Sequence, residues 1–305
     1  MVGSANTDLV LRLDRLPRPG ETLLGGRFDT SPGGKGANQA VGAARAGGRV
    51  VFVARLGDDP AGQLAVEGYR RAGIDVRHIV RDPEEPSGTA FIFVARDGEN
   101  CIGVAPGANA KLSAADVQRA TAAFRRAAVL LTQLESPPAA VATAVRLAAA
   151  RGITVILNPA PARPVPDTLL RRVAILTPNE TEAGVLTGLR VRDAASAARA
   201  AERLLKRGAG AAVITLGARG AFVAAPGVRV LVPGFKVKAV DTTAAGDIFN
   251  GALAVALSEK LALTDAVRFA NAAAALSVAR RGAQPSAPDR ARIARLLRRP
   301  RPVWP

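Results

Sequence analysis

The sequence predicts an α/β protein: a three-layer sandwich whose mostly parallel central sheet is covered by helices on both faces, with a small antiparallel β lid. Three observations predict this fold. Short apolar runs alternate with longer amphipathic runs from residue 112 onward, as strands and helices do around a parallel sheet. Polar residues follow several of the apolar runs. A hairpin pattern at residues 87–104 stands outside the alternation.

The regular part of the chain contains buried strands joined by helices. Strands are predicted at 50–54, 129–134, 153–157, 173–176, 211–216 and 235–240, with an edge hairpin at 221–225 and 228–232. Helices are predicted at about 113–126, 193–207, 248–257 and 264–280. Ser113 and Asp116 have the spacing of a capping box, which places the start of the first of these helices.

Several polar or glycine residues stand at or just after predicted strand ends. These residues are Glu135, Asn179, Thr215, Gly217 and Asp241. Because ligands of open α/β sheets bind beyond the carboxyl ends of the strands, we expect these residues on one rim. The sequence therefore predicts a single active-site cleft.

Two segments are predicted to form the lid. Residues 9–28 alternate weakly and are broken by prolines and a glycine, which indicates a strand, a turn and a second strand. In residues 87–104, Asp97-Gly98 separates two β-prone runs and is a strong turn signal. We therefore expect one domain over residues 1–305, with lid segments inserted at about 9–30 and 87–106.

Composition limits the function classes. The chain carries a formal charge of +17, which could attract nucleic acid, but its arginines are dispersed and only 4% of its residues are aromatic. No stacking platform for bases is visible, so the sequence argues against nucleic acid. The densest basic cluster, residues 298–302, and the nearby Trp304 are expected in a solvated tail.

The sequence also predicts a cytoplasmic protein. No apolar run reaches the ~20 residues that a membrane span needs. The first residues lack the basic and then apolar pattern of a signal peptide. A single cysteine, Cys101, excludes an internal disulfide framework.

The stretch from Asp241 to Asp247 carries the clearest chemistry. It is a turn of small residues between a predicted strand and an apolar helix, where free N–H groups and the helix dipole favour an anion. A carboxylate at Asp247 beside an anion site suits a base that deprotonates a hydroxyl as it attacks a phosphoryl group. From these residues alone, a simple helix cap is an equally weighted reading.

A second stretch, Gly33-Gly34-Lys35-Gly36-Ala37-Asn38, precedes an alanine-rich helix. Its glycines let the backbone lie against a ligand, and Lys35 and Asn38 offer donors to hydroxyl groups. The alternative is a flexible turn with a solvated lysine.

Together, the two stretches resemble the ribokinase-like family of sugar kinases. The second stretch, extended to Gln39-Ala40, resembles the family's sugar-binding motif. The first, with Phe249-Asn250-Gly251, resembles its C-terminal signature, in which the family usually has glycine at position 244. Matching segments cover nearly the whole chain. In this family a strand precedes the loop at residues 3–8, whereas only Met1 and Val2 precede it here. Either the first strand is truncated or the natural start lies upstream.

The resemblance implies an ATP-dependent kinase acting on the primary hydroxyl of a pentose, most closely D-ribose, with Mg²⁺ and the monovalent activator K⁺. It also implies a homodimer formed through the lid. Within the class, deoxyribose, a fructose-type sugar or an adenosine-type nucleoside remain alternatives. Outside it, a non-catalytic sugar- or nucleotide-binding regulator and a nucleic-acid-binding protein are the rivals. The intact Gly246-Asp247 pair argues against the regulator, because a sensor needs no base beside a phosphate.

The resemblance also assigns roles to individual residues. Asp247 is the base, and the N–H groups of Ala245, Gly246 and Asp247 form the anion hole. The expected sugar-binding residues are Asn6, Asp8, Gly33, Gly34, Lys35, Gly36, Asn38, Glu135 and Asp247. The expected nucleotide-binding residues are Asn179, Thr215, Gly217, Gly220, Gly246 and Asn271. The expected ligands of the monovalent cation, several through backbone carbonyls, are Asp241, Thr243, Ser277, Arg280, Gly282 and Ser286. From the residues alone, Asn6 and Asp8 would equally suit Asx turns, and Gly282 a helix end.

Overall fold

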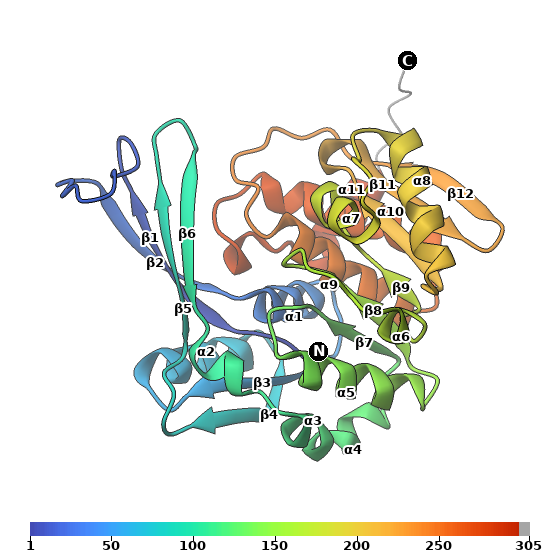
Figure 1. Cartoon of the computed structure of the whole chain (residues 1–305), viewed down its shortest axis with the longest axis horizontal. Helices are drawn as coiled ribbons and strands as arrows, with labels where there is room; N and C mark the ends of the chain where they lie inside the picture. The colour runs from blue at the N-terminus through green and yellow to red at the C-terminus, as the bar shows by residue number, and fades with distance from the viewer. Residues whose placement is uncertain (299–305) are drawn as a thin grey trace.

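A computed structural model describes residues 1–298 of the chain (Figure 1). Residues 299–305 lie outside the described part. The prediction of a solvated tail, which falls on 298–302 and Trp304, therefore lies almost wholly beyond it.

The central sheet is mostly parallel, as predicted. Six strands lie in the order β12-β11-β10-β9-β8-β7, and β3 pairs with β4. Their bounds are β3 (Val51–Gly57), β4 (Asp75–Asp82), β7 (Val129–Thr132), β8 (Thr154–Leu157), β9 (Ile175–Leu176), β10 (Ala211–Thr215), β11 (Gly220–Ala225) and β12 (Val228–Pro233). Val2 joins the two parts through single parallel bridges to Val53 and Thr132. Ahead of the loop at residues 3–8, strand pairing is thus limited to Val2.

Helices cover both faces of this sheet. One face carries α1 (Lys35–Arg45), α2 (Pro60–Arg71), α9 (Ala245–Ser258), α10 (Leu263–Val278) and α11 (Arg290–Leu297). The other carries α3 (Ala114–Arg119), α4 (Thr121–Phe124), α5 (Pro138–Ala149), α6 (Asp167–Leu170), α7 (Glu180–Thr187) and α8 (Ala194–Lys206). Three short 3₁₀ turns complete the elements, η1 (Gly107–Lys111), η2 (Gly217–Arg219) and η3 (Gln284–Ser286).

The alternation of strand side chains explains the three layers. Along β10, Val213 packs in one buried cluster, whereas Ala212 and Ile214 pack in the other. Successive side chains of a strand point to opposite faces, so a run of apolar residues fills both cores at once. Within residues 1–298, no helix combines the length and the apolarity that crossing a bilayer requires.

Two predicted elements differ from the structure. The helix expected at 113–126 begins with the predicted capping box of Ser113 and Asp116 but is interrupted at Ala120. The strand predicted at 235–240 is wrong, because this segment has no strand partner. Phe235 packs on the core, but Val240 donates its N–H to the carbonyl of Val278, at the end of α10 (2.7 Å). A segment with alternating apolar residues forms the hydrogen bonds of a sheet only when a neighbouring strand lies beside it.

The lid is a separate four-stranded sheet, seen at the left of Figure 1. Its order is β2-β1-β5-β6, formed by β1 (Asn6–Arg12), β2 (Arg27–Gly33), β5 (Gly88–Val94) and β6 (Asn100–Ala105). The two outer pairs are antiparallel as predicted, but the central pair β1–β5 is parallel. Strand β1 begins at Asn6, so Asn6 and Asp8 lie on a strand rather than in the loop predicted at residues 3–8.

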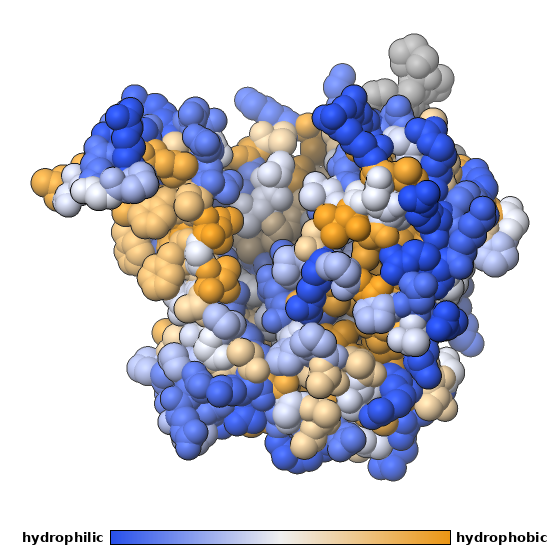
Figure 2. Space-filling model, in the orientation of Figure 1, coloured by the Kyte–Doolittle hydropathy of each residue, from blue (hydrophilic) through white to orange (hydrophobic). Residues whose placement is uncertain are grey.

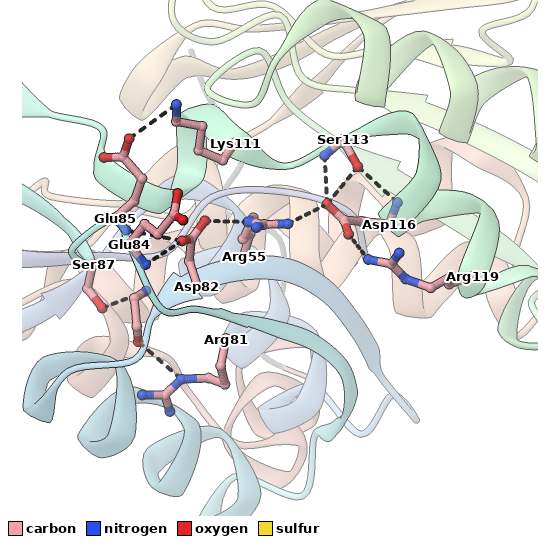
Figure 3. A network of polar contacts seen from close by, with 11 residues as sticks. Arg55, Arg81, Asp82, Glu84, Glu85, Ser87, Lys111, Ser113, Asp116 and Arg119 are labelled. Atoms are coloured by element: carbon pink, nitrogen blue, oxygen red, sulfur yellow. Dashed lines mark hydrogen bonds and ion pairs between the residues drawn. The ribbon is translucent and has the colours of Figure 1, made fainter.

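An ion-pair network holds the base of the lid (Figure 3). Arg55 of β3 donates to Asp82 at the end of β4 (2.6 Å) and to Asp116 of α3 (3.2 Å). Asp82 in turn accepts the N–H groups of Glu84 and Glu85 (both 3.0 Å), which lead into the lid. Because one guanidinium satisfies two buried carboxylates, this network ties the lid to two elements of the body.

Candidate active site

A cavity of about 190 Å³ lies at the carboxyl ends of the central strands. Its lining residues come from five separate segments of the chain: Lys35, Asn158, Ala160, Thr177, Asn179, Glu182, Thr215, Thr242, Ala244, Ala245, Gly246, Asp247 and Asn250. Of the residues expected on one rim, Asn179 and Thr215 line this cavity. Residues of the motif at 241–247 line it together with Lys35 of the glycine-rich stretch.

Asp247 stands in the first turn of α9 and is 7% exposed. Its Oδ2 accepts the side-chain amide of Asn38 (3.1 Å), and its Oδ1 accepts that of Gln39 (3.0 Å). Burial raises the pKa of Asp247, while the Lys35 charge and the two amide donors oppose this rise. The amides of Asn38 and Gln39 thus hold the carboxylate in place. It lines the cavity and keeps lone pairs available for a ligand.

A chain of buried amides supports this carboxylate. Gln39 also donates to Asn158 Oδ1 (3.0 Å) and accepts from the side-chain amide of Gln133. Asn158 donates to the carbonyl of Thr177 (3.0 Å). Because each amide is fixed by the next, Gln39 has little freedom to turn its donor away from Asp247.

The turn before α9 differs in one respect from the predicted anion hole. Ala244 adopts a left-handed conformation with φ of 57°, and Ala245 donates its N–H to the carbonyl of Thr242 (3.2 Å). No backbone acceptor within residues 1–298 takes the N–H of Gly246 or Asp247. A Cβ built at Gly246 meets no atom within 4 Å, so this residue faces open space. Two N–H groups of this turn, those of Gly246 and Asp247, therefore remain available to an anion.

The glycine-rich stretch packs closely on residues 3–8. A Cβ at Gly34 would lie 2.7 Å from the Cα of Ala5, and one at Gly36 would lie 2.5 Å from the nitrogen of Ser4. A Cβ at Gly33 would overlap the Asp8 carboxylate at 2.1 Å. These glycines are required because no side chain fits between the two segments.

Glu135 binds both segments. It accepts the backbone N–H of Lys35 (3.0 Å) and the hydroxyl of Ser4 (2.5 Å), and the Lys35 ammonium lies 3.8 Å away. The structure thus brings Glu135, Lys35 and Asp247 into one electrostatic group.

Asp8 joins this group from the lid strand β1. Burial, followed by the charge of Glu135, raises the pKa of Asp8 to about 6. Its neighbour Asn6 accepts a hydrogen bond from the amide of Asn109 (2.8 Å), which fixes the lid strand to η1.

Lys35 is the cation that these acids share. Burial alone would lower the pKa of Lys35, but the charges of Asp247, Glu135, Glu182 and Asp8 outweigh it and raise that pKa. The ammonium therefore stays charged, within reach of hydroxyl or phosphate oxygens.

Asn38 was predicted to contact the sugar, but its amide is already engaged within the protein. It donates to Asp247, and its oxygen accepts from the amide of Gln284 (3.2 Å). Its position therefore helps to orient the Asp247 carboxylate, and its contact with the sugar stays a prediction.

The expected nucleotide residues fall into two groups. Asn179 caps α7, and Thr215 ends the neighbouring strand β10; both line the cavity. Gly217 and Gly220 follow β10 with positive φ, and Gly217 faces open space. Asn271 instead donates its amide to the carbonyls of Val232 and Pro233 (3.1 and 3.2 Å), so it holds the end of β12.

The expected cation ligands lie on two loops joined by Asp241. Its carboxylate accepts the N–H of Thr243 and that of Gly282, each at 2.9 Å. Ser277 and Ser286 are buried, and their hydroxyls donate to carbonyls in their own turns. Arg280 begins the second loop, where its N–H donates to the carbonyl of Ser277 (2.9 Å).

Sequence reasoning missed Gln39 and Glu182. Glu182 lines the cavity, and burial raises its pKa, although the N–H of Asn179 opposes this. The spacing of Asn179 and Glu182, a capping box in the structure, was a visible signal. Gln39 follows Asn38 directly and gave no separate signal.

A buried carboxylate beside an ammonium and an open amide turn is an arrangement that suits phosphoryl transfer to an alcohol. The family described as "pfkB family carbohydrate kinase" matches residues 1–290. The chain belongs to this family and is an ATP-dependent carbohydrate kinase.

The chain is similar to kinases of several organisms along nearly its whole length. The ribokinase of Haemophilus influenzae is 45% identical over 290 residues, 95% of each chain. The deoxyribokinase of Salmonella typhi is 35% identical over 290 residues, also 95% of each chain. The structure of Arabidopsis thaliana ribokinase complexed with ribose and ATP superposes with a TM-score of 0.90 at 35% identity, covering 98% of each chain.

The raised pKa of Asp8 leads to a prediction about substrate binding. A group with a pKa of about 6 is ionised at pH 7 and mostly protonated at pH 5, where it loses an acceptor for sugar hydroxyls. We expect the KM for the sugar to rise about tenfold as the pH falls from about 7 to about 5. In Asp8→Asn, the KM should be high and flat over this interval. A wild-type KM that does not change between these pH values would contradict this role.

Proposed function

We propose that this protein transfers the γ-phosphoryl group of ATP to the primary hydroxyl of D-ribose and releases D-ribose 5-phosphate and ADP. The observation that carries this proposal is the Asp247 carboxylate, held by two buried amides in the cavity that the Gly246 turn and Lys35 also line. The full-length similarity to ribokinases supports the choice of sugar. The rival reading as a non-catalytic regulator leaves this pre-oriented base unexplained.

The proposed transfer uses Asp247 and the turn before α9. Asp247 takes the proton of the primary hydroxyl as that oxygen forms its bond to the γ-phosphorus. The bond from this phosphorus to the oxygen bridging the β-phosphate breaks, and ADP leaves with its electron pair. The N–H groups of Gly246 and Asp247, at the positive end of α9, stabilise the negative charge on the transferred group.

Mg²⁺ is proposed to accompany the nucleotide. Within residues 1–298 no cluster of three or more carboxylate, histidine or cysteine side chains could hold a metal alone. Glu182 supplies a hard oxygen at the cavity, which fits an ion that keeps most of its waters and binds phosphates. When bound, Mg²⁺ neutralises phosphate charge. Turnover that persists in EDTA would exclude this requirement.

Substitution of the proposed general base tests the function. We expect Asp247→Asn to lower kcat by about 10³-fold or more, because general-base catalysis is lost while the cavity keeps its shape. ATP affinity, measured by calorimetry, should remain within a few fold. The matched control is Asp265→Asn, an exposed aspartate in the first turn of the next helix, which should keep the full rate. A fully active Asp247→Asn enzyme would remove Asp247 from this role.

The acceptor is tested separately with the wild-type enzyme. The panel contains D-ribose, 2-deoxy-D-ribose, D-fructose and adenosine, each compared by kcat/KM. The highest value is expected for D-ribose, because a site that binds a hydroxyl discriminates against the analogue lacking it. A higher value for 2-deoxy-D-ribose would reassign the acceptor within the family.

We further propose K⁺ as an activator bound beside the loop of Asp241. Burial opposes ionisation of Asp241, but hydrogen bonds from Thr243 and Gly282 lower its pKa, so this carboxylate is anionic at neutral pH. The Asp241 carboxylate connects the turn before α9 to the loop after α10. A cation bound beside this carboxylate would order both segments.

Activation by K⁺ should depend on Asp241. We expect a severalfold higher kcat in K⁺ than in a tetramethylammonium buffer of equal ionic strength, and no such difference in Asp241→Asn. An equal rate of the wild-type enzyme in both buffers would rule out the activator.

We also propose that two copies pair through their lids. Leu9 and Phe91 are register partners, as are Leu11 and Phe28, so these residues share the lid face opposite to Asp8. Phe91 is 48% exposed and Phe28 60% exposed. Figure 2 shows hydrophobic surface gathered over the lid at the left. An uncovered apolar sheet face of this kind is typical of an interface.

The lid pairing has a direct test. In sedimentation, Phe91→Lys should shift the protein from a dimer to its monomer mass of 31.3 kDa, because a charge would be buried at the interface. Val230→Lys, on the exposed hairpin strand β12, is the matched control and should leave the dimer intact. A wild-type protein that sediments as a monomer would contradict the proposal.

A further inference from the structure

The side chain of Asn250 lies in α9, one turn beyond Gly246, and is buried. Its amide nitrogen donates to the carbonyl of Gly246 (2.8 Å). Its amide oxygen accepts the hydroxyl of Thr177 (2.6 Å), a buried residue that directly follows β9. Both Asn250 and Thr177 line the active-site cavity, yet the proposed transfer gives neither of them a role.

The hydrogen bonds determine which way the Asn250 amide points. The carbonyl oxygen of Gly246 only accepts hydrogen bonds, so the NH₂ group of Asn250 must face it. The amide oxygen of Asn250 then faces Thr177, whose hydroxyl is the donor. This hydroxyl has one hydrogen, and the carbonyl of Leu157 lies farther away (3.4 Å), so Asn250 receives it.

The bond from Asn250 fixes one peptide group of the turn before α9. The peptide between Gly246 and Asp247 is planar and trans, so its carbonyl and its N–H point in opposite directions. Because Asn250 holds the carbonyl, the direction of the Asp247 N–H is fixed as well. This N–H is one of the two that remain available to an anion. The Thr177 hydroxyl therefore acts on the turn through Asn250.

The backbone of Thr177 supports the Asp247 carboxylate. The Thr177 carbonyl accepts the side-chain amide of Asn158 (3.0 Å). Asn158 accepts the side-chain amide of Gln39 (3.0 Å), and Gln39 donates to Oδ1 of Asp247 (3.0 Å). The support of the carboxylate and the support of the anion-binding turn thus meet at Thr177.

These contacts close a ring, because Gly246 is joined to Asp247 by the peptide bond. The five side chains of the ring are at most 7% exposed, so water competes little for their hydrogen bonds. The ring consists of Asp247, Gln39, Asn158, Thr177, Asn250 and Gly246.

We propose that Thr177 and Asn250 are positioning residues, and that the ring keeps the carboxylate and the N–H of Asp247 in one fixed relative orientation. This inference rests on the proposed function. The carboxylate must meet the acceptor hydroxyl while the N–H meets the transferred phosphoryl group, so the transfer needs both directions at once. A loosened ring leaves substrate binding intact and weakens only the stabilisation of the transition state.

The first test removes the Thr177 hydroxyl and keeps the shape of the side chain. We expect Thr177→Val to lower kcat at least about tenfold, because the freed Asn250 amide no longer holds the Gly246 carbonyl. The KM values for the sugar acceptor and for ATP should stay within about twofold of the wild-type values. Thr177→Ser restores the hydroxyl and should return kcat to within about threefold of the wild type.

Asn250→Leu tests the same bond from its other end, and should likewise lower kcat with little change in either KM. The double variant Thr177→Val/Asn250→Leu should be no slower than Asn250→Leu alone, because two residues that act through one bond do not have additive effects. Additive losses of kcat would show that the two residues act separately, and would overturn the ring.

The matched control is Thr187→Val. Thr187 is also buried, but its hydroxyl donates to the carbonyl of Ala183 within its own helix α7 (2.6 Å). This variant should lose a comparable amount of thermal stability and keep the full kcat. An equal loss of kcat in Thr187→Val would overturn the positioning role of Thr177.

The Asp247→Asn variant, measured in the same series, separates this inference from the proposed function. If Asp247→Asn is inactive and Thr177→Val keeps the full kcat, the ring has no positioning role and the proposed function stands. If Asp247→Asn is fully active, or the wild-type enzyme phosphorylates no acceptor, the proposed function fails and this inference falls with it.

Discussion

The close packing of α1 on α9 is the constraint on which the active site depends. A Cβ at Gly251 would lie 2.5 Å from the Gln39 carbonyl and 2.7 Å from the Ala43 nitrogen, so the two helices meet backbone to backbone. This contact lets the amides of Asn38 and Gln39 reach the carboxylate of Asp247 from a distant part of the chain. Any larger residue at Gly251 would separate the base from its supports.

The anion turn combines this packing with local strain. Ala244 holds a left-handed φ of 57°, a conformation that costs an alanine on the order of 1 kcal/mol or more relative to glycine. The turn keeps it because Ile248 donates to the Ala244 carbonyl (2.9 Å) and starts the helix there. The strained turn therefore fixes the direction of the N–H groups of Gly246 and Asp247, which the proposed transfer uses.

Much of the fold and part of the site could be predicted from the sequence. Apolar runs fix strands such as β10 because both faces are buried, and the glycine-rich motif marks Gly34 because close approach excludes a side chain there. The strand predicted at 235–240 is wrong because this segment lacks a partner strand. The hydrogen bond from the Asn38 amide to Asp247 was likewise not predicted. Both features depend on which segments the folded chain places side by side, and hydrophobic periodicity does not record this.

The charges around Lys35 contrast with those of the whole molecule. The chain carries +17, yet Asp8, Glu135, Glu182 and Asp247 surround one ammonium in the cleft. An uncharged sugar enters this region without electrostatic cost, whereas the same sugar leaves as a dianion facing acidic neighbours. The acidic cleft thus favours release of the phosphorylated product. The residues proposed to bind the acceptor therefore also promote product release.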